Sequence, residues 1–256
     1  MQAMPALLSG KRVAILGSAR GLGLAVAKAA SAAGASVIGI DAVTGFDHVE
    51  EFYHLDPGDP GAIDRVADAL PDGLEGLCLM PHFDPADDPD HALLACVMGP
   101  KRLAERAAPR MAAGAAIVTQ GAPFDAGREK HLALIRAAIA LRPETATGFA
   151  ARWGLSAEPP LLPKLIGWAM AAWAMQHADA WGPNGPRCNC LVTASPDGRL
   201  PAAISASRGI DAGAGQDHAA HAAIFLLSAL AAGVTGAALA ADGGLSAKTQ
   251  TSLEGL

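Results

Sequence analysis

The amino-acid sequence predicts a doubly wound α/β domain, in which helices cover both faces of a parallel sheet. Short apolar runs bounded by glycine or polar residues alternate along the chain with longer stretches of helix-forming residues. The length of 256 residues suits one such domain, and hydrophobic residues make up 51% of the chain, enough for a full core. We therefore expect one domain over residues 1–256.

The order of the predicted elements follows from these apolar runs. A strand at 12–16 precedes a glycine cluster and a helix at 22–33, and a second strand at 35–40 precedes a helix at 61–70. A long helix over 92–111 contains Pro100, which we expect to kink it just beyond Cys96. The remaining buried strands are predicted at 76–80, 115–119, 187–192 and 237–241.

Composition excludes several classes of function. The formal net charge of -6 offers no basic surface to nucleic acid. The four cysteines form no C-x-x-C pair, which favours reduced thiols in a cytoplasmic protein over disulfides or a zinc site. The uncharged run at 222–241 is interrupted by glycine and threonine, as a buried helix, a turn and a buried strand would be. We therefore expect no membrane segment.

A glycine-rich turn follows the first strand and opens the first helix. Its residues Gly17, Ser18, Arg20, Gly21, Leu22 and Gly23 are predicted to hold a pyrophosphate, because glycines allow close backbone approach and the helix N-terminus offers free N–H groups. Asp41 ends the second strand, where its carboxylate would accept hydrogen bonds from a ribose and repel a 2'-phosphate. This Rossmann-type arrangement predicts NAD rather than NADP, although Arg20 could meet a 2'-phosphate.

The G-x-x-x-G-x-G spacing, the strand at 186–192 and the closing run GAALAADGG at 236–244 resemble the short-chain dehydrogenase/reductase family. The resemblance covers about residues 11–244. It implies that Asp56 contacts the adenine end, and that a substrate loop lies at about 195–216. A helical insertion at about 123–162, before the fifth main helix, is similar to the subgroup containing 3α-hydroxysteroid dehydrogenase and coniferyl-alcohol dehydrogenase.

This resemblance also implies a degenerate catalytic set. The family's lysine corresponds to Lys164, which would also hold the nicotinamide ribose, but its tyrosine corresponds to Pro160. The serine falls at Gly121 or Ala122, and the asparagine corresponds to Cys96. The chain's single tyrosine, Tyr53, lies too early in the sequence to replace the missing one.

The nicotinamide half of the cofactor site differs from the family as well. The family's turn after the fourth strand reads Met80-Pro81-His82, with histidine in place of a glycine. The adenosine half keeps its pattern, so the sequence allows NAD(H) binding or no cofactor at all. No metal site is predicted, since His218 and His221 lack a third ligand.

Two functional hypotheses remain open. The first is a non-catalytic or regulatory subunit that pairs with an active relative or binds a ligand. The second is an NAD(H)-dependent oxidoreductase for secondary alcohols or ketones with an unusual acid/base, for which His82 is the first candidate. In either case the resemblance implies a homo- or hetero-oligomer, a dimer or tetramer assembled through the helices around 90–112 and 164–180.

Overall fold

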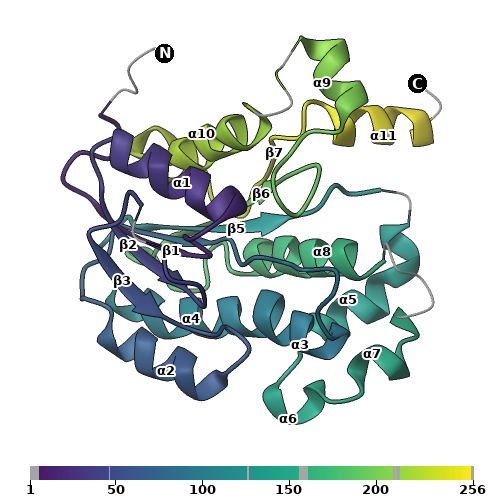
Figure 1. The fold of residues 1–256 in the computed structure, drawn as a ribbon, viewed down its shortest axis with the longest axis horizontal. Helices are drawn as coiled ribbons and strands as arrows, with labels where there is room; N and C mark the ends of the chain where they lie inside the picture. Colours follow the sequence, from purple (N-terminus) through teal and green to yellow (C-terminus); the bar gives the residue numbers. More distant parts are fainter. Residues whose placement is uncertain are drawn as a thin grey trace.

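The fold is a single seven-stranded parallel sheet with helices on both faces (Figure 1). A computed structural model describes residues 6–45, 47–125, 127–155, 161–209, 211 and 214–254. The strand order is β3-β2-β1-β4-β5-β6-β7, so the order reverses between β1 and β4. The strands are β1 (Arg12–Leu16), β2 (Ser36–Asp41), β3 (Glu51–His54), β4 (Gly76–Leu79), β5 (Ala116–Gly121), β6 (Arg187–Val192) and β7 (Ala238–Ala240).

All six predicted strands are present, with bounds that shift by at most two residues. The prediction that the last strand is buried was wrong, because β7 lies at an edge of the sheet and none of its residues is fully buried. Strand β3, which contains Tyr53 and pairs with β2 at the edge of the sheet, was not predicted from the sequence. Glu51 and His54 are exposed, and no residue of this strand is fully buried. An edge strand needs no continuous apolar run, so the hydrophobic pattern gave no signal for it.

Two helical layers enclose the sheet. On one face α1 and α10 pack side by side, and on the other α2, α4 and α8 form the layer (Figure 1). Two buried clusters result, one between each helical layer and the sheet. The bounds of these helices are α1 (Gly21–Ala32), α2 (Pro60–Ala69), α4 (Gly99–Ala107), α8 (Leu161–Gln176) and α10 (Gly215–Leu227).

The helix predicted around Pro100 is divided into three parts. A short α3 (Pro89–Leu93) is followed by a π-helical turn (Leu94–Met98) and then by α4. Proline has no N–H to donate to the carbonyl four residues earlier, which disfavours a regular α-helix at this point. A π-turn that contains Cys96 therefore lies just before Pro100, where the sequence predicted a kink.

The described residues of the insertion include three short α-helices, one packed on α8 and two in contact with α3. These are α5 (Leu132–Ile139), α6 (Pro143–Ala146) and α7 (Phe149–Arg152), and α5 packs directly on α8. The Asp90 carboxylate accepts hydrogen bonds from Gly148 N at 2.5 Å and Ala150 N at 2.7 Å, and the Lys101 ammonium donates to Ile139 O. A carboxylate and a buried ammonium thus attach the insertion to the helices beneath it.

Helix α8 is buried within its own chain. Trp168 and Trp173 are each 1% exposed, and Trp168 Nε1 donates a hydrogen bond to Pro123 O at 2.8 Å. Most apolar residues of this helix therefore have partners in the insertion and in β5 and β6, whereas Met175 is exposed. Assembly through residues 90–112 and 164–180 stays a prediction.

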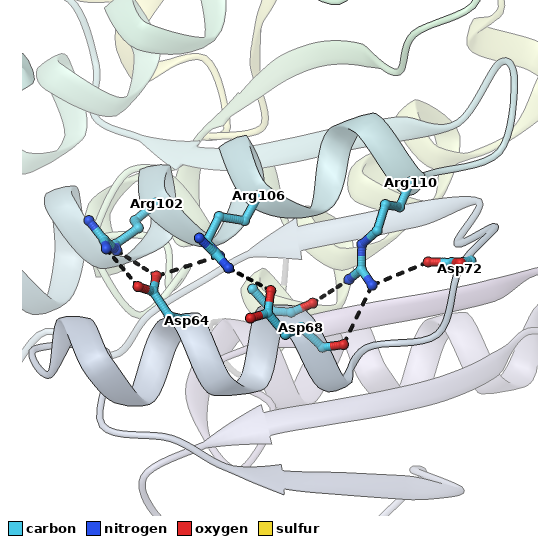
Figure 2. Close-up of polar contacts among 7 residues, drawn as sticks. Asp64, Asp68, Asp72, Arg102, Arg106 and Arg110 are labelled. Atoms are coloured by element: carbon cyan, nitrogen blue, oxygen red, sulfur yellow. Dashed lines mark hydrogen bonds and ion pairs between the residues drawn. The ribbon is translucent and has the colours of Figure 1, made fainter.

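A ladder of ion pairs joins α2 to α4 and the 3₁₀ turn that follows it, Ala108–Arg110 (Figure 2). Three aspartates and three arginines repeat at intervals of four residues. This spacing brings Asp64 and Asp68 to one face of α2, and Arg102 and Arg106 to one face of α4. Asp72 and Arg110 lie beyond the ends of these two helices. Arg102 forms two hydrogen bonds of 2.7 Å with Asp64, and Arg106 reaches Asp68 at 2.6 Å. The ladder consists of Asp64, Asp68, Asp72, Arg102, Arg106 and Arg110.

In the described part of the chain, no helix combines the length and apolar character needed to cross a membrane. The apolar run at 222–241 folds instead as the end of α10, the 3₁₀ turn Ala229–Ala231 and strand β7.

Candidate functional site

The glycine-rich turn connects β1 to α1 and needs its glycines for steric reasons. Gly17 has a φ of +86°, and a Cβ on it would lie 1.9 Å from Met80 O. A Cβ on Gly23 would lie 2.0 Å from Gly17 O. Any side chain at either position would force the turn apart, so these two glycines hold β1, β4 and α1 close together whether or not a ligand binds.

The first turn of α1 has no side-chain cap. Arg20 occupies the N-cap position and is exposed, but its side chain makes no capping hydrogen bond. The N-terminal amides of α1 therefore lack a side-chain acceptor, and the helix dipole adds a partial positive charge there. This end of α1 suits an anion such as a pyrophosphate.

Ser18 and Leu22 are placed differently from the other residues of the turn. Ser18 is 1% exposed, and its hydroxyl lies over Gly39 of β2 without a hydrogen-bond partner in the described residues. Leu22 is 3% exposed and belongs to the core beneath α1 and α10. A cofactor would meet the backbone of these two residues and not their side chains.

Asp41 ties the end of β2 to the glycine-rich turn. Its Oδ2 accepts a hydrogen bond from Ala19 N at 3.0 Å, and its Oδ1 accepts one from Val43 N at 2.9 Å. Asp41 is 5% exposed. A carboxylate can accept about four hydrogen bonds, so each oxygen keeps one acceptor site for a ribose hydroxyl.

The predicted adenine contact, Asp56, lies in an exposed turn after β3. Its Oδ1 accepts a hydrogen bond from Gly58 N at 2.8 Å. The register of the sheet also pairs Asp41 with His54 at the carboxyl ends of β2 and β3. Sequence reasoning missed His54, since β3 itself was not recognised.

A cavity of about 440 Å³ opens at the carboxyl ends of β4, β5 and β6. Its walls are mostly apolar side chains from the ends of these strands, the loops that follow them, and α8. Leu245 and Thr249 of α11 (Leu245–Glu254) complete the lining. This is the edge of the sheet where parallel α/β proteins bind their ligands, beside the reversal of strand order.

The structure brings three of the four expected catalytic positions to this cavity. Cys96, Ala122 and Lys164 all line it, although they come from a π-turn, a loop and α8. The fourth position, Pro160, lies outside the described residues. Gly121 and Gly167 pack closely beneath the cavity, where a Cβ on Gly167 would lie 2.4 Å from Ala122 Cβ.

Cys96 offers no acid or base at neutral pH. Its Sγ donates to His82 O at 3.6 Å, and the side chain is 2% exposed. Burial, with a smaller effect of the Asp87 charge, raises the pKa of this thiol to about 12. It therefore stays protonated, and the methyl group of Ala122 offers no hydrogen bond.

Lys164 is paired with a residue that sequence reasoning missed. Its Nζ lies 2.7 Å from Asp125 Oδ2 across the cavity mouth, and Asp125 Oδ1 accepts a hydrogen bond from Gly127 N at 3.0 Å. Asp125 follows β5 and begins a D-x-G turn. A carboxylate in such a turn at a strand's carboxyl end is the signal that could have identified it.

His82 lies beside the glycine-rich turn, with Nδ1 4.0 Å from the point that a Cβ on Gly21 would occupy. The cavity lining includes its neighbours Pro81 and Phe83 but not His82 itself. A catalytic role for His82 stays a prediction, and its position favours a contact with the turn over one with a ligand in the cavity.

Metal chemistry gains no support from the side-chain arrangement. Within the described ranges, no three His, Cys, Asp or Glu side chains gather as a metal site requires. His218 and His221 are exposed on α10, with ring centroids 6.4 Å apart.

No model of a known protein family matches the chain. It is 25% identical over 194 residues to the coniferyl-alcohol dehydrogenase of a Pseudomonas species, a match that covers 72% of each chain.

Among solved structures, the 3-alpha-hydroxysteroid dehydrogenase of a Pseudomonas species complexed with NADH matches with a TM-score of 0.74 and 22% identity, over 94% of this chain and 99% of that one. A short chain dehydrogenase of Burkholderia cenocepacia in complex with NADP matches with a TM-score of 0.64 and 22% identity, over 93% and 98%. The chain therefore has the fold of the short-chain dehydrogenases/reductases, as its resemblance to that family predicted.

Proposed function

We propose that this chain binds a nicotinamide dinucleotide and serves as a non-catalytic, regulatory or ligand-binding subunit. The observation that carries the proposal is the lining of the cavity at the expected catalytic position, where Cys96 and Ala122 replace hydrogen-bonding groups and Lys164 is engaged by Asp125. The solved relatives carry NADH or NADP.

Binding is supported on the adenosine side of the site. The uncapped N-terminus of α1 suits the pyrophosphate, and Asp41 keeps acceptor sites for the ribose hydroxyls. The same carboxylate would repel a 2'-phosphate, so NAD(H) is the preferred cofactor and not NADP(H). Tight packing at Gly17 and Gly23 keeps this half of the site in a fixed shape.

Hydride transfer between a secondary alcohol and a ketone also requires a group that takes up or gives the oxygen's proton. Such a group contributes about 10²-fold to 10⁴-fold to the rate, and members of one catalytic unit act together. The thiol of Cys96 is held protonated by burial, and Ala122 has no exchangeable proton. We therefore assign the cavity to ligand binding.

We place this function in an oligomer, either of identical subunits or with an active relative. We place it in the cytoplasm, where the four free, buried cysteines would remain reduced.

The oxidoreductase alternative would need an acid/base outside the family's set. His82 was the candidate for that role, but it does not belong to the cavity lining.

Calorimetric titration of the purified protein with NADH and NADPH tests the proposal, combined with turnover assays on a panel of secondary alcohols and ketones. We expect NADH to bind more tightly than NADPH and turnover to stay at the level of the uncatalysed reaction. Asp41→Ala should weaken NADH binding and serves as the binding-site control. Measurable turnover that is lost in His82→Asn would favour the alternative, and failure to bind either nucleotide would refute the cofactor assignment.

A further inference from the structure

The second half of a bound dinucleotide would enter the cavity that contains Lys164. Dinucleotides bind across the reversal of strand order, with one nucleoside on each side. Asp41 marks the β1–β2 side for the adenosine, so the distal nucleoside extends over β4, β5 and β6. Among the described residues that line the cavity there, Asp125 and Lys164 are the charged ones.

The two partners of this ion pair differ in how firmly they are held. Asp125 is fixed through its second oxygen, which accepts the hydrogen bond from Gly127 N, and its side chain is 22% exposed. Lys164 has a flexible side chain that is 49% exposed, and Asp125 is the partner that the structure gives to its ammonium. The carboxylate therefore determines where the ammonium lies.

We propose that Asp125 restrains dinucleotide binding by holding the Lys164 ammonium in an ion pair, away from the hydroxyls of the distal ribose. This inference rests on the proposed cofactor binding and adds a specificity-determining residue to it. Two effects act in the same direction. The ion pair must be disturbed before Lys164 can turn to a ribose, and the Asp125 charge cancels the attraction between Lys164 and the anionic diphosphate.

Asp125→Asn removes both effects of the Asp125 charge without disturbing the fold. Asparagine keeps an oxygen for the Gly127 N–H, so the turn is preserved while the charge is removed. Asp84→Asn is a matched control, because Asp84 forms the same kind of turn through a 2.9 Å hydrogen bond with Ala86 N. Lys164→Gln and the double variant complete a cycle that isolates the coupling between the two side chains.

The test uses calorimetric titration with 5'-AMP, ADP-ribose and NADH. Relative to 5'-AMP, ADP-ribose adds the second phosphate together with the distal ribose, and NADH then adds the nicotinamide. We expect Asp125→Asn to tighten ADP-ribose and NADH binding by about twofold to fivefold, as loss of a partly exposed ion pair allows, and to leave 5'-AMP binding unchanged. In the Lys164→Gln background, adding Asp125→Asn should give no gain in affinity. Asp84→Asn should change none of the three affinities.

The two proposals fail in different ways. If 5'-AMP binds and Asp125→Asn leaves ADP-ribose and NADH affinity unchanged or weaker, the restraint by Asp125 is refuted and cofactor binding stands. An equal gain for all three nucleotides would also refute it, because the effect would then be one of general charge. If none of the nucleotides binds to the wild type or to Asp125→Asn, both proposals are wrong.

Discussion

Replacement of Asp41 by asparagine tests two roles of this carboxylate, which are to stabilise the glycine-rich turn and to recognise the cofactor. The carboxylate accepts two backbone hydrogen bonds at a 5% exposed position. Asparagine has one oxygen, so its amide group must face either the Ala19 or the Val43 N–H as a second donor. Val43 is 47% exposed, which lets water satisfy its N–H, and we expect the oxygen to stay with Ala19.

Asp41→Asn then destabilises the fold in two ways. One hydrogen bond to a charged group is lost, and the other becomes a hydrogen bond to a neutral group. A hydrogen bond to a charged group contributes about 1.5–3 kcal/mol, so the free energy of unfolding should fall by about 2 kcal/mol. For a chain of this length that corresponds to a decrease in Tm of about 4–8 °C. NADH affinity should fall about tenfold, and the preference for NADH over NADPH should shrink because the repulsive charge is gone.

Urea denaturation followed by circular dichroism measures the first effect, and titration with both nucleotides measures the second. Asp56→Asn is the control, since Asp56 accepts one backbone hydrogen bond in an exposed turn and should change stability by less than about 0.5 kcal/mol. An Asp41→Asn protein with unchanged stability and unchanged nucleotide preference would refute the role given to this carboxylate.

Three further predictions concern stability. A double-mutant cycle of Asp64→Asn and Arg102→Gln in the ion-pair ladder should give a coupling of about 0.5–1 kcal/mol that decreases in high salt, and a coupling near zero would contradict the bidentate pair. Burial lowers the pKa of Lys101 below 10.5, so the unfolded chain holds this proton more tightly than the folded protein does. The free energy of unfolding of the wild type should therefore increase as the pH rises toward 10.5. Lys101→Met should lack that gain in urea titrations across this range, and an identical pH dependence would refute the assignment. Burial raises the pKa of the Cys78 thiol from 9.0 to about 12, so the unfolded chain loses this proton first. The free energy of unfolding should therefore fall as the pH rises above 9.0, by at most about 1.4 kcal/mol per pH unit for this group. Cys78→Ala should show a shallower decline than the wild type.

The parts of the fold that the sequence predicted are those with a strong local signal. The strands β1, β2, β4, β5 and β6 are predominantly apolar and almost wholly buried, since both of their faces are covered. Strand β3 has its pairing partner in β2 and no buried residue of its own, so its position depends on a neighbour and not on its own pattern.

The candidate site divides in the same way. The glycine-rich turn and Asp41 could be recognised because their spacing is set by one strand, one turn and one helix in continuous sequence. The cavity collects Cys96, Ala122 and Lys164 from separate elements, and here the family resemblance supplied the correspondence that local pattern could not. The position of His82 beside Gly21, and outside the cavity lining, became visible only in three dimensions.

By itself, the sequence determined the doubly wound α/β fold class and the dinucleotide-type turn, and its family resemblance led us to expect Lys164 without the family's tyrosine, serine and asparagine. Only the tertiary structure decided what Lys164 meets instead. Asp125 is 39 residues away in sequence, and the two side chains come within 2.7 Å because β5 and α8 pack against each other at the carboxyl edge of the sheet. The strength of an ion pair depends on such distances and on exposure, and neither is encoded in the local pattern around either residue.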